Sequence, residues 1–204
     1  VACKSEVRGS QGRLTLFYRN KSSVHAVEAL TAVFSDTAGF LRSQASELPS
    51  SLAPGAQVEQ QVMIECMKPS DVKPMLHVSY REVAGAARDN TCELPLHMTL
   101  FNDPLPLSAE DFHKRWQALT GPGQEGTACV ITRASLSLEQ AAQIFEKTLK
   151  FSRVQGQGQG AAADCLQGAA SLRTGATSPS GEKVTLGCLL RVEVSGATVN
   201  ITCR

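Results

Sequence analysis

The sequence has 204 residues, of which 42% are hydrophobic and 19% charged, and its formal net charge is +1. This composition is typical of a folded chain with room for one large domain or two small ones, and it excludes an intrinsically disordered protein. A nearly neutral chain also lacks a global basic field with which to hold nucleic acid or an anionic membrane surface.

The first hundred residues have the pattern of an all-β domain. Short apolar or alternating runs are separated by turn signals rich in Gly, Pro, Asn and Ser, which favours an antiparallel, immunoglobulin-like β-sandwich. Pro95 lies inside the last run, so we expect that strand to be at an edge or to contain a bulge. The predicted strands are 13–18, 27–34, 57–66, 75–80 and 91–97.

The segment 102–107 contains two prolines, which cannot continue the interior of a sheet. We therefore expect two domains, 1–101 and 102–204. A helix over 108–119 is predicted next, with Ser108 as its N-cap and Asp111 three residues on. Phe112 and Trp116, the only tryptophan, stand four residues apart and would share one face of this helix.

The rest of the second half mixes a helix with strands, which predicts an α+β subdomain. We expect a short strand at 129–132, a helix over 138–149 that begins at Ser137, and two strands, 183–194 and 198–203, joined by a hairpin at Ser195-Gly196. The low-complexity run 155–160, alternating Gln and Gly, is predicted to be a surface loop. Because the last strand ends with the sequence, we expect the chain to be part of a longer protein.

The cysteines and the chain's first residues bear on the compartment. The seven cysteines are odd in number, widely spaced and without a Cys-x-x-Cys pair. We therefore expect no zinc site and no disulfide scaffold, but reduced thiols buried in a cytoplasmic protein. The chain opens without a charged and apolar leader, and no apolar run approaches the ~20 residues that span a bilayer.

Catalytic motifs are absent from the sequence, which leaves a binding surface as the leading hypothesis. There is no nucleophile elbow, P-loop, His-Glu-x-x-His motif or dinucleotide fingerprint. Phe112 and Trp116 are candidates for an apolar pocket wall, and Arg191 and Arg204 on neighbouring strands are candidates for contacts with acidic residues of a peptide. The alternatives remain open that Trp116 is a core residue, that these arginines are ordinary surface residues, and that the chain is a degenerate enzyme domain.

Several short motifs, spread over both ends of the chain, resemble those of one family. They are Lys4-Ser-Glu6, Gly12-Arg13, Phe17-Tyr18, Asn20-Lys21, Gly55-Ala-Gln-Val58, Ile64-Glu-Cys66, Asp111-Phe112, Arg115-Trp116 and Gly187-Cys-Leu-Leu-Arg191. In this respect the chain resembles the C-terminal appendage, or ear, of the α-adaptin large subunit of the clathrin adaptor AP-2. The resemblance fades between Gly121 and Lys183.

The resemblance implies a recruitment module without enzymatic activity, cofactor or metal. An ear of this family is a β-sandwich joined to a platform, and it binds Asp-Pro-Phe, Asp-Pro-Trp and Phe-x-Asp-x-Phe motifs in disordered endocytic accessory proteins. The implied partners also include the other subunits of a heterotetrameric adaptor, and the implied location is cytoplasmic, on clathrin-coated pits at the plasma membrane. An ear of γ-adaptin, β-adaptin or coatomer is the alternative.

The implied sites can be assigned to positions of this chain. The platform site would consist of Phe112, His113, Trp116, Arg191, Asn200 and Arg204. A weaker site on the sandwich, for Trp-x-x-Phe motifs, would consist of Lys4, Phe17 and Gln57. Three positions differ from the family pattern: His113 replaces a Phe, Asn200 replaces an Arg, and Arg19 replaces a Gly beside the sandwich site. The family's closing helix has no counterpart in this sequence.

Overall fold

The structure is a computed structural model that describes residues 1–82, 85–133, 135–154 and 165–204. The chain divides into two compact units. The first unit contains residues 1–101 together with 174–184, and the second contains 102–173 and 185–204. The predicted loop at 155–160 lies outside the described residues.

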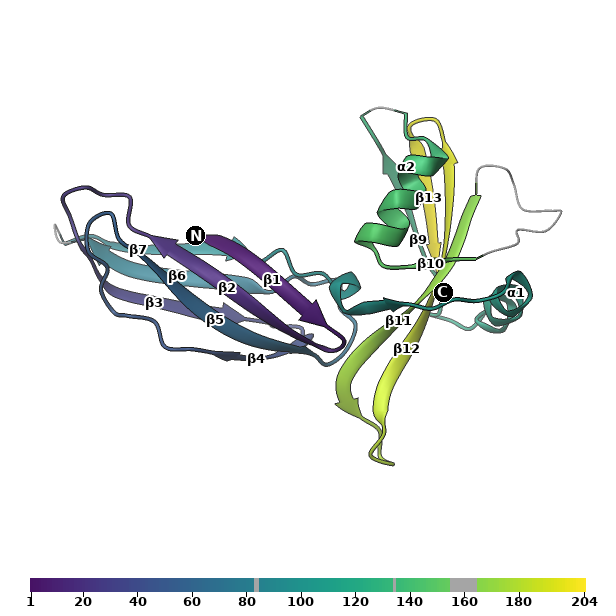
Figure 1. Cartoon of the computed structure of the whole chain (residues 1–204), viewed down its shortest axis with the longest axis horizontal. Helices are drawn as coiled ribbons and strands as arrows, with labels where there is room; N and C mark the ends of the chain where they lie inside the picture. Colours follow the sequence, from purple (N-terminus) through teal and green to yellow (C-terminus); the bar gives the residue numbers. More distant parts are fainter. Residues whose placement is uncertain (83–84, 134, 155–164) are drawn as a thin grey trace. The chain divides into compact units, whose positions relative to one another are not determined.

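The first unit contains a β-sandwich of two antiparallel sheets, which confirms the predicted all-β fold (Figure 1). One sheet has the strand order β1-β2-β5-β4 and the other the order β3-β6-β7. The strands are β1 (Ala2–Arg8), β2 (Gln11–Arg19), β3 (Val27–Ser35), β4 (Leu41–Ala45), β5 (Gln57–Cys66), β6 (Met75–Glu82) and β7 (Ala87–Glu93), and a 3-10 helix, η1 (Met98–Phe101), follows them.

The alternating sequence of β2 shows why this segment is a strand. Leu14, Leu16 and Tyr18 are buried between the two sheets, whereas Phe17 and Arg19 lie on the outer face. The core of the sandwich also contains a ring pair, because the fully buried Phe40 contacts Phe101 edge to face with centroids 5.8 Å apart. Burial of one face of each sheet stabilises the sandwich.

The last strand of the sandwich differs from the prediction. β7 covers Ala87–Glu93 and pairs with β6 from Arg81↔Ala87 to Met75↔Glu93, so the predicted strand at 91–97 is displaced towards the C-terminus. Pro95 has no backbone N–H for a ladder hydrogen bond and lies beyond the end of β7. Leu94 and Leu96, on either side of Pro95, are buried although they lie beyond the strand. Their apolar side chains produced the alternating pattern on which the prediction rested.

The second unit is a mixed α+β platform, as predicted. Its sheet has the order β10-β11-β12-β13-β9, and β8 pairs with β11 although it contains Pro104. The elements are β8 (Asn102–Pro104), α1 (Ala109–Ala118), β9 (Gly126–Ile131), α2 (Leu138–Gln143), the π-helix η2 (Ile144–Thr148), β10 (Ser152–Arg153), β11 (Cys165–Thr177), β12 (Lys183–Ser195) and β13 (Thr198–Cys203).

The helix caps follow the sequence predictions. The Ser108 Oγ accepts a hydrogen bond from the Asp111 N–H at 3.1 Å, and Ser137 and Gln140 form a capping box. The helix predicted over 138–149 is instead divided, since α2 ends at Gln143 and continues as the π-helix η2. Among the described residues, no helix is long and apolar enough to cross a membrane.

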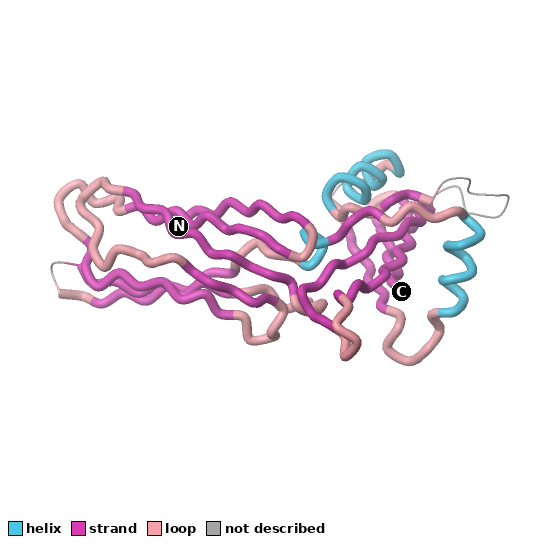
Figure 2. Tube along the Cα trace, turned by 60° about the horizontal axis from the view of Figure 1, so that its bottom comes forward, coloured by secondary structure: helices cyan, strands magenta, loops and turns pink. Residues whose placement is uncertain are grey.

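The two helical segments pack on opposite faces of the platform sheet (Figures 1 and 2). Leu190 and Val192 of β12 belong to the apolar cluster under α2 and η2, whereas Leu189 belongs to the cluster under α1. Because successive strand residues point to opposite faces, Arg191 lies on the α1 face. On the face of the sheet that α1 covers, polar side chains of β12 and β13 therefore lie close to this helix, which contains Trp116.

Candidate functional site

The aromatic pair of α1 lies at the centre of the candidate platform residues. The rings of Phe112 and Trp116 are stacked, with centroids 5.5 Å apart and planes inclined by 22°. Phe112 is only 1% exposed, so it supports the Trp116 ring from beneath and offers no surface of its own, whereas Trp116 is partly exposed. His113 is exposed beside them, and its ring lies edge-on to Phe112 at 5.9 Å.

Arg204 covers the tryptophan ring. Its guanidinium carbon lies 4.7 Å from the Trp116 ring centroid, and its Nη1 donates to the Trp116 backbone carbonyl at 2.7 Å. The backbone of Arg204 is held in the sheet by two hydrogen bonds with Leu189 of β12, of 2.6 and 2.9 Å. A cation over an indole face is electrostatically favourable, and it is more so when partly shielded from water.

Arg191 and Asn200 lie on the same face of the sheet. Arg191 is directly opposite Thr202 on β13, and Asn200 is opposite Glu193. Thr202 is two residues from Arg204, so the two arginine positions are separated by about 7 Å along the strands. The Arg191 Nη2 contacts Glu193 Oε1 at 2.9 Å, and its buried Nε has no hydrogen-bond partner among the described residues.

The structure thus brings the platform candidates together and adds one residue that the sequence did not indicate. Phe112, Trp116 and Arg204 are in direct contact, while His113 flanks them on α1 and Arg191 and Asn200 share the facing sheet surface. The added residue is Glu125, in the loop between α1 and β9, whose Oε2 lies 2.5 Å from Arg204 Nε and Nη2.

The sandwich candidates share the outer face of the β1-β2-β5 sheet. Lys4 is opposite Thr15, two residues from the half-buried Phe17, and Gln57 is directly opposite Arg19. The Lys4 ammonium contacts Glu6 at 2.9 Å. The exposed Arg19 therefore stands beside both Phe17 and Gln57 on the surface that a peptide would have to cover.

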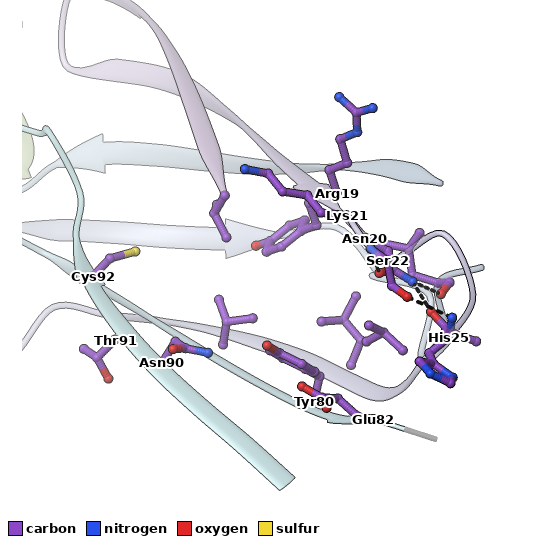
Figure 3. A pocket seen from close by; sticks show the side chains of 17 residues that line it. Arg19, Asn20, Lys21, Ser22, His25, Tyr80, Glu82, Asn90, Thr91 and Cys92 are labelled. Atoms are coloured by element: carbon purple, nitrogen blue, oxygen red, sulfur yellow. Dashed lines mark hydrogen bonds between the residues drawn. The ribbon is translucent and has the colours of Figure 1, made fainter. Parts of the chain in front are cut away.

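A separate cavity of about 780 Å³ lies inside the sandwich unit, between the sheets (Figure 3). Its wall includes Tyr18 and Asn20, while Arg19 at its rim points away from it (Figure 3). The Asn20 amide donates to the carbonyls of His25, Leu52 and Ala53. Burial, with the nearby Cys92 and Cys3, raises the pKa of Tyr18 to about 12, and its hydroxyl donates to Gln60. These two polar groups are thus engaged in holding the sandwich together.

None of the seven cysteines, all of which the structure describes, is in a disulfide. Cys66 and Cys165 are buried, as expected of free thiols in apolar runs, whereas Cys92 and Cys129 are exposed on strands at the edges of their sheets. Cys188 and Cys203 lie on the α2 face with their Sγ atoms 3.1 Å apart. In the part of the chain that the structure describes, no three His, Cys, Asp or Glu side chains gather as a metal site would require.

Comparison with known proteins identifies relatives of this chain. Residues 1–96 match the family model of the adaptin C-terminal domain. The AP-2 complex subunit alpha-1 of Arabidopsis thaliana is 31% identical over 147 residues, which is 71% of this chain and 14% of that protein. The AP-2 complex subunit alpha-2 of Dictyostelium discoideum is 31% identical over 121 residues, 59% of this chain and 12% of that protein.

The AP-2 complex subunit alpha of Schizosaccharomyces pombe is 25% identical over 116 residues, 57% of this chain and 13% of that protein. Among solved structures, the GAE domain of GGA2p from Saccharomyces cerevisiae covers 46% of this chain and 86% of its own, with 17% identity and a TM-score of 0.39. The chain therefore spans about one seventh of the length of the curated relatives named here.

Proposed function

Because the chain belongs to the C-terminal appendage, or ear, domains of AP-2 α-adaptins, we propose that it recruits endocytic accessory proteins by binding short linear motifs. The motifs are of the Asp-Pro-Phe, Asp-Pro-Trp and Phe-x-Asp-x-Phe type, in disordered tails. The three curated proteins named above are AP-2 alpha subunits, which favours this interpretation over an ear of γ-adaptin, β-adaptin or coatomer.

The observation that carries the proposal is the partly exposed Trp116 ring, which stacks on Phe112 and has the Arg204 guanidinium over it. A partly exposed indole on a rigid helix suits an aromatic side chain of a motif, and buried aromatic contacts tend to dominate such interfaces. Arg191, which pairs with Glu193, and Arg204 supply the cations for the motif's acidic side chain. His113 and Asn200 border the same surface.

In this proposal a single motif binds weakly, in the micromolar range or worse, because ordering a disordered segment offsets much of the contact free energy. Several motifs on one tail, presented to adaptors that are clustered at a coated pit, raise the overall affinity without new contacts. The full-length protein assembles with the other subunits of a heterotetrameric adaptor, and it is located in the cytoplasm on clathrin-coated pits at the plasma membrane.

The outer sandwich face is proposed as a second, weaker site for Trp-x-x-Phe motifs. Phe17 supplies the apolar contact there, and Lys4 and Gln57 supply polar ones. The Arg19 side chain lies beside Phe17 and Gln57, so it restricts access to this site.

The test is a calorimetric titration of a Phe-x-Asp-x-Phe peptide into the chain. We expect micromolar binding that Trp116→Ala removes, and that the matched control Ile144→Ala leaves unchanged, since Ile144 is an exposed apolar residue on η2, on the other face of the sheet. Thermal unfolding checks that both variants are folded. No binding by the folded wild type, or normal binding by Trp116→Ala, would overturn the proposal.

A further inference from the structure

The edge of the Arg204 guanidinium that best fits a carboxylate is already occupied by a carboxylate of the same chain. Arg204 Nε and Nη2 both lie 2.5 Å from Glu125 Oε2, and Nη1 donates to the Trp116 carbonyl. The Nε–Nη2 edge presents two parallel N–H donors, and carboxylates bind this edge with charge-assisted hydrogen bonds. A ligand carboxylate that uses the same edge must therefore replace Glu125.

The loop before β9 explains how Glu125 reaches this position. Gly121 and Gln124 close a turn, with a backbone hydrogen bond of 3.1 Å and a bond from the Gly121 N–H to the Gln124 side chain of 2.8 Å. Gly123 takes a positive φ of 77° within it, which glycine adopts without strain. The turn places the next residue, Glu125, against Arg204, which is 79 residues away in the sequence.

The exposure of the pair makes replacement by a ligand feasible. The Glu125 side chain is 41% exposed, whereas that of Arg204 is 20% exposed and is held over Trp116. The arginine is therefore fixed in place, while the acid is on the solvent side of the pair. An exposed ion pair of this kind is weak, and exchanging one carboxylate for another conserves the hydrogen bonds of the arginine.

We propose that Glu125 is a specificity-determining residue of the platform, whose carboxylate holds the place of the motif's acidic side chain at Arg204. This inference rests on the proposed motif-binding function. An acidic motif must displace Glu125. It therefore binds more weakly than it would if Arg204 had no carboxylate partner in the chain. A peptide without the acid cannot take over the arginine, and Glu125 stays where it is.

The experiment compares wild type, Glu125→Gln and Glu146→Gln by titration with two peptides, Phe-x-Asp-x-Phe and its Phe-x-Asn-x-Phe counterpart. Glu146 is exposed on η2, on the opposite face of the sheet. Glu146→Gln therefore changes the net charge of the protein as Glu125→Gln does, but at a position far from Arg204. Emission of Trp116, the only tryptophan, reports binding independently of calorimetry. We expect Glu125→Gln to tighten binding of the Asp peptide by about two- to fivefold. The Asn peptide and the Glu146→Gln protein should show no such gain.

The remaining outcomes separate the two proposals. If wild type binds the Asp peptide and Glu125→Gln binds it equally well or more weakly, the role of Glu125 is overturned and motif binding stands. If Glu125→Gln tightens both peptides alike, its effect is not competition between carboxylates, and the role is again overturned. If neither folded protein binds either peptide, the motif-binding function fails, and the role of Glu125 fails with it.

Discussion

The guanidinium of Arg204 lies 4.7 Å from the centroid of the Trp116 ring and donates to the backbone carbonyl of the same residue. Two separate interactions thus join the end of β13 to the last turn of α1. A cation–π contact contributes about 0.5–1 kcal/mol at an exposed site and more when water is excluded. The aromatic surface proposed to bind motifs therefore depends on the residue that follows β13 as well as on its own helix.

Arg204→Lys is expected to uncover the Trp116 ring. Lysine keeps the charge but lacks the planar guanidinium that stacks on the indole and bonds both Glu125 and the Trp116 carbonyl. The emission maximum of Trp116 should move to longer wavelength, and the affinity for a Phe-x-Asp-x-Phe peptide should fall by about three- to tenfold. Arg115→Lys, at the exposed neighbour of Trp116 on α1, is the control. Unchanged emission and affinity in Arg204→Lys would contradict the stacking role.

Phe112→Ala is expected to destabilise the platform unit by about 3–5 kcal/mol, the usual cost of removing a buried phenyl ring. Phe112 is 1% exposed and packs against Trp116 and the apolar side chains beneath α1. Urea unfolding followed by Trp116 emission reports this unit selectively, because the only tryptophan lies in it. The adjacent, exposed His113→Ala should change the free energy of unfolding by no more than about 0.5 kcal/mol. A loss below about 1 kcal/mol for Phe112→Ala would show that Phe112 is not the support inferred here.

The parts of the fold that the sequence predicts well are those with local signals. The start of α1 follows from Ser108 and Asp111, and the hairpin between β12 and β13 follows from Gly196, whose φ of 60° suits a tight turn. Strands β2, β5 and β6 follow from period-two alternation. These signals depend on neighbours in sequence, so they can be read without the tertiary structure.

Strand β11 shows why other parts could not be predicted. It is one of the longest strands, yet its sequence is rich in small residues with low β-propensity. Gly168 is needed because a Cβ there would lie 2.4 Å from a carbon of the Phe145 ring, and Ala169 and Ala170 are fully buried. Close packing from other elements selects these residues. Glu125 is similar, since its partner Arg204 is distant in sequence and no periodicity marks the pair.

The thiol pair Cys188 and Cys203 predicts a pH dependence of platform stability. The hydrogen bond between the Cys188 and Cys203 sulfurs lowers the pKa of Cys203 to about 7 and, together with burial, raises the pKa of Cys188. A folded-state pKa below the unfolded value of 9.0 stabilises the folded state increasingly as pH rises from 7 to 9, and this stabilisation is lost as pH falls through 7. The raised pKa of Cys188 acts in the opposite sense above pH 9.

Cys188→Ala should remove this dependence. The difference in unfolding free energy between wild type and Cys188→Ala is expected to grow between pH 7 and 9, by at most about 1 kcal/mol after allowance for partial exposure. Urea unfolding at several pH values, followed by Trp116 emission, measures it. Cys129→Ala, at an exposed thiol of the same unit, is the control. A difference that stays constant across this range would mean that Cys203 is not a thiolate near neutral pH.

Arg19→Ala is expected to open the outer sandwich face to Trp-x-x-Phe peptides. Arg19 is directly opposite Gln57 and two residues from Phe17 on the same face of β2, so a peptide bound to both would have to accommodate its side chain. The wild-type chain should bind such a peptide weakly or not at all. The variant should bind it at least about threefold more tightly, because removing the Arg19 side chain lets the peptide make a few contacts that this side chain blocks.

Arg13→Ala is the matched control for this variant, because Arg13 lies on the same strand and outer face but about 20 Å further along it and pairs with Glu6. Since the peptide itself contains tryptophan, calorimetry and backbone amide shifts of Lys4 and Phe17 are the readouts. A gain in Arg19→Ala with shifts at these two residues would place the peptide on the sandwich face. Equal, negligible binding by all three proteins would mean that the side chain of Arg19 is not what closes this surface, and the sandwich site should then be withdrawn.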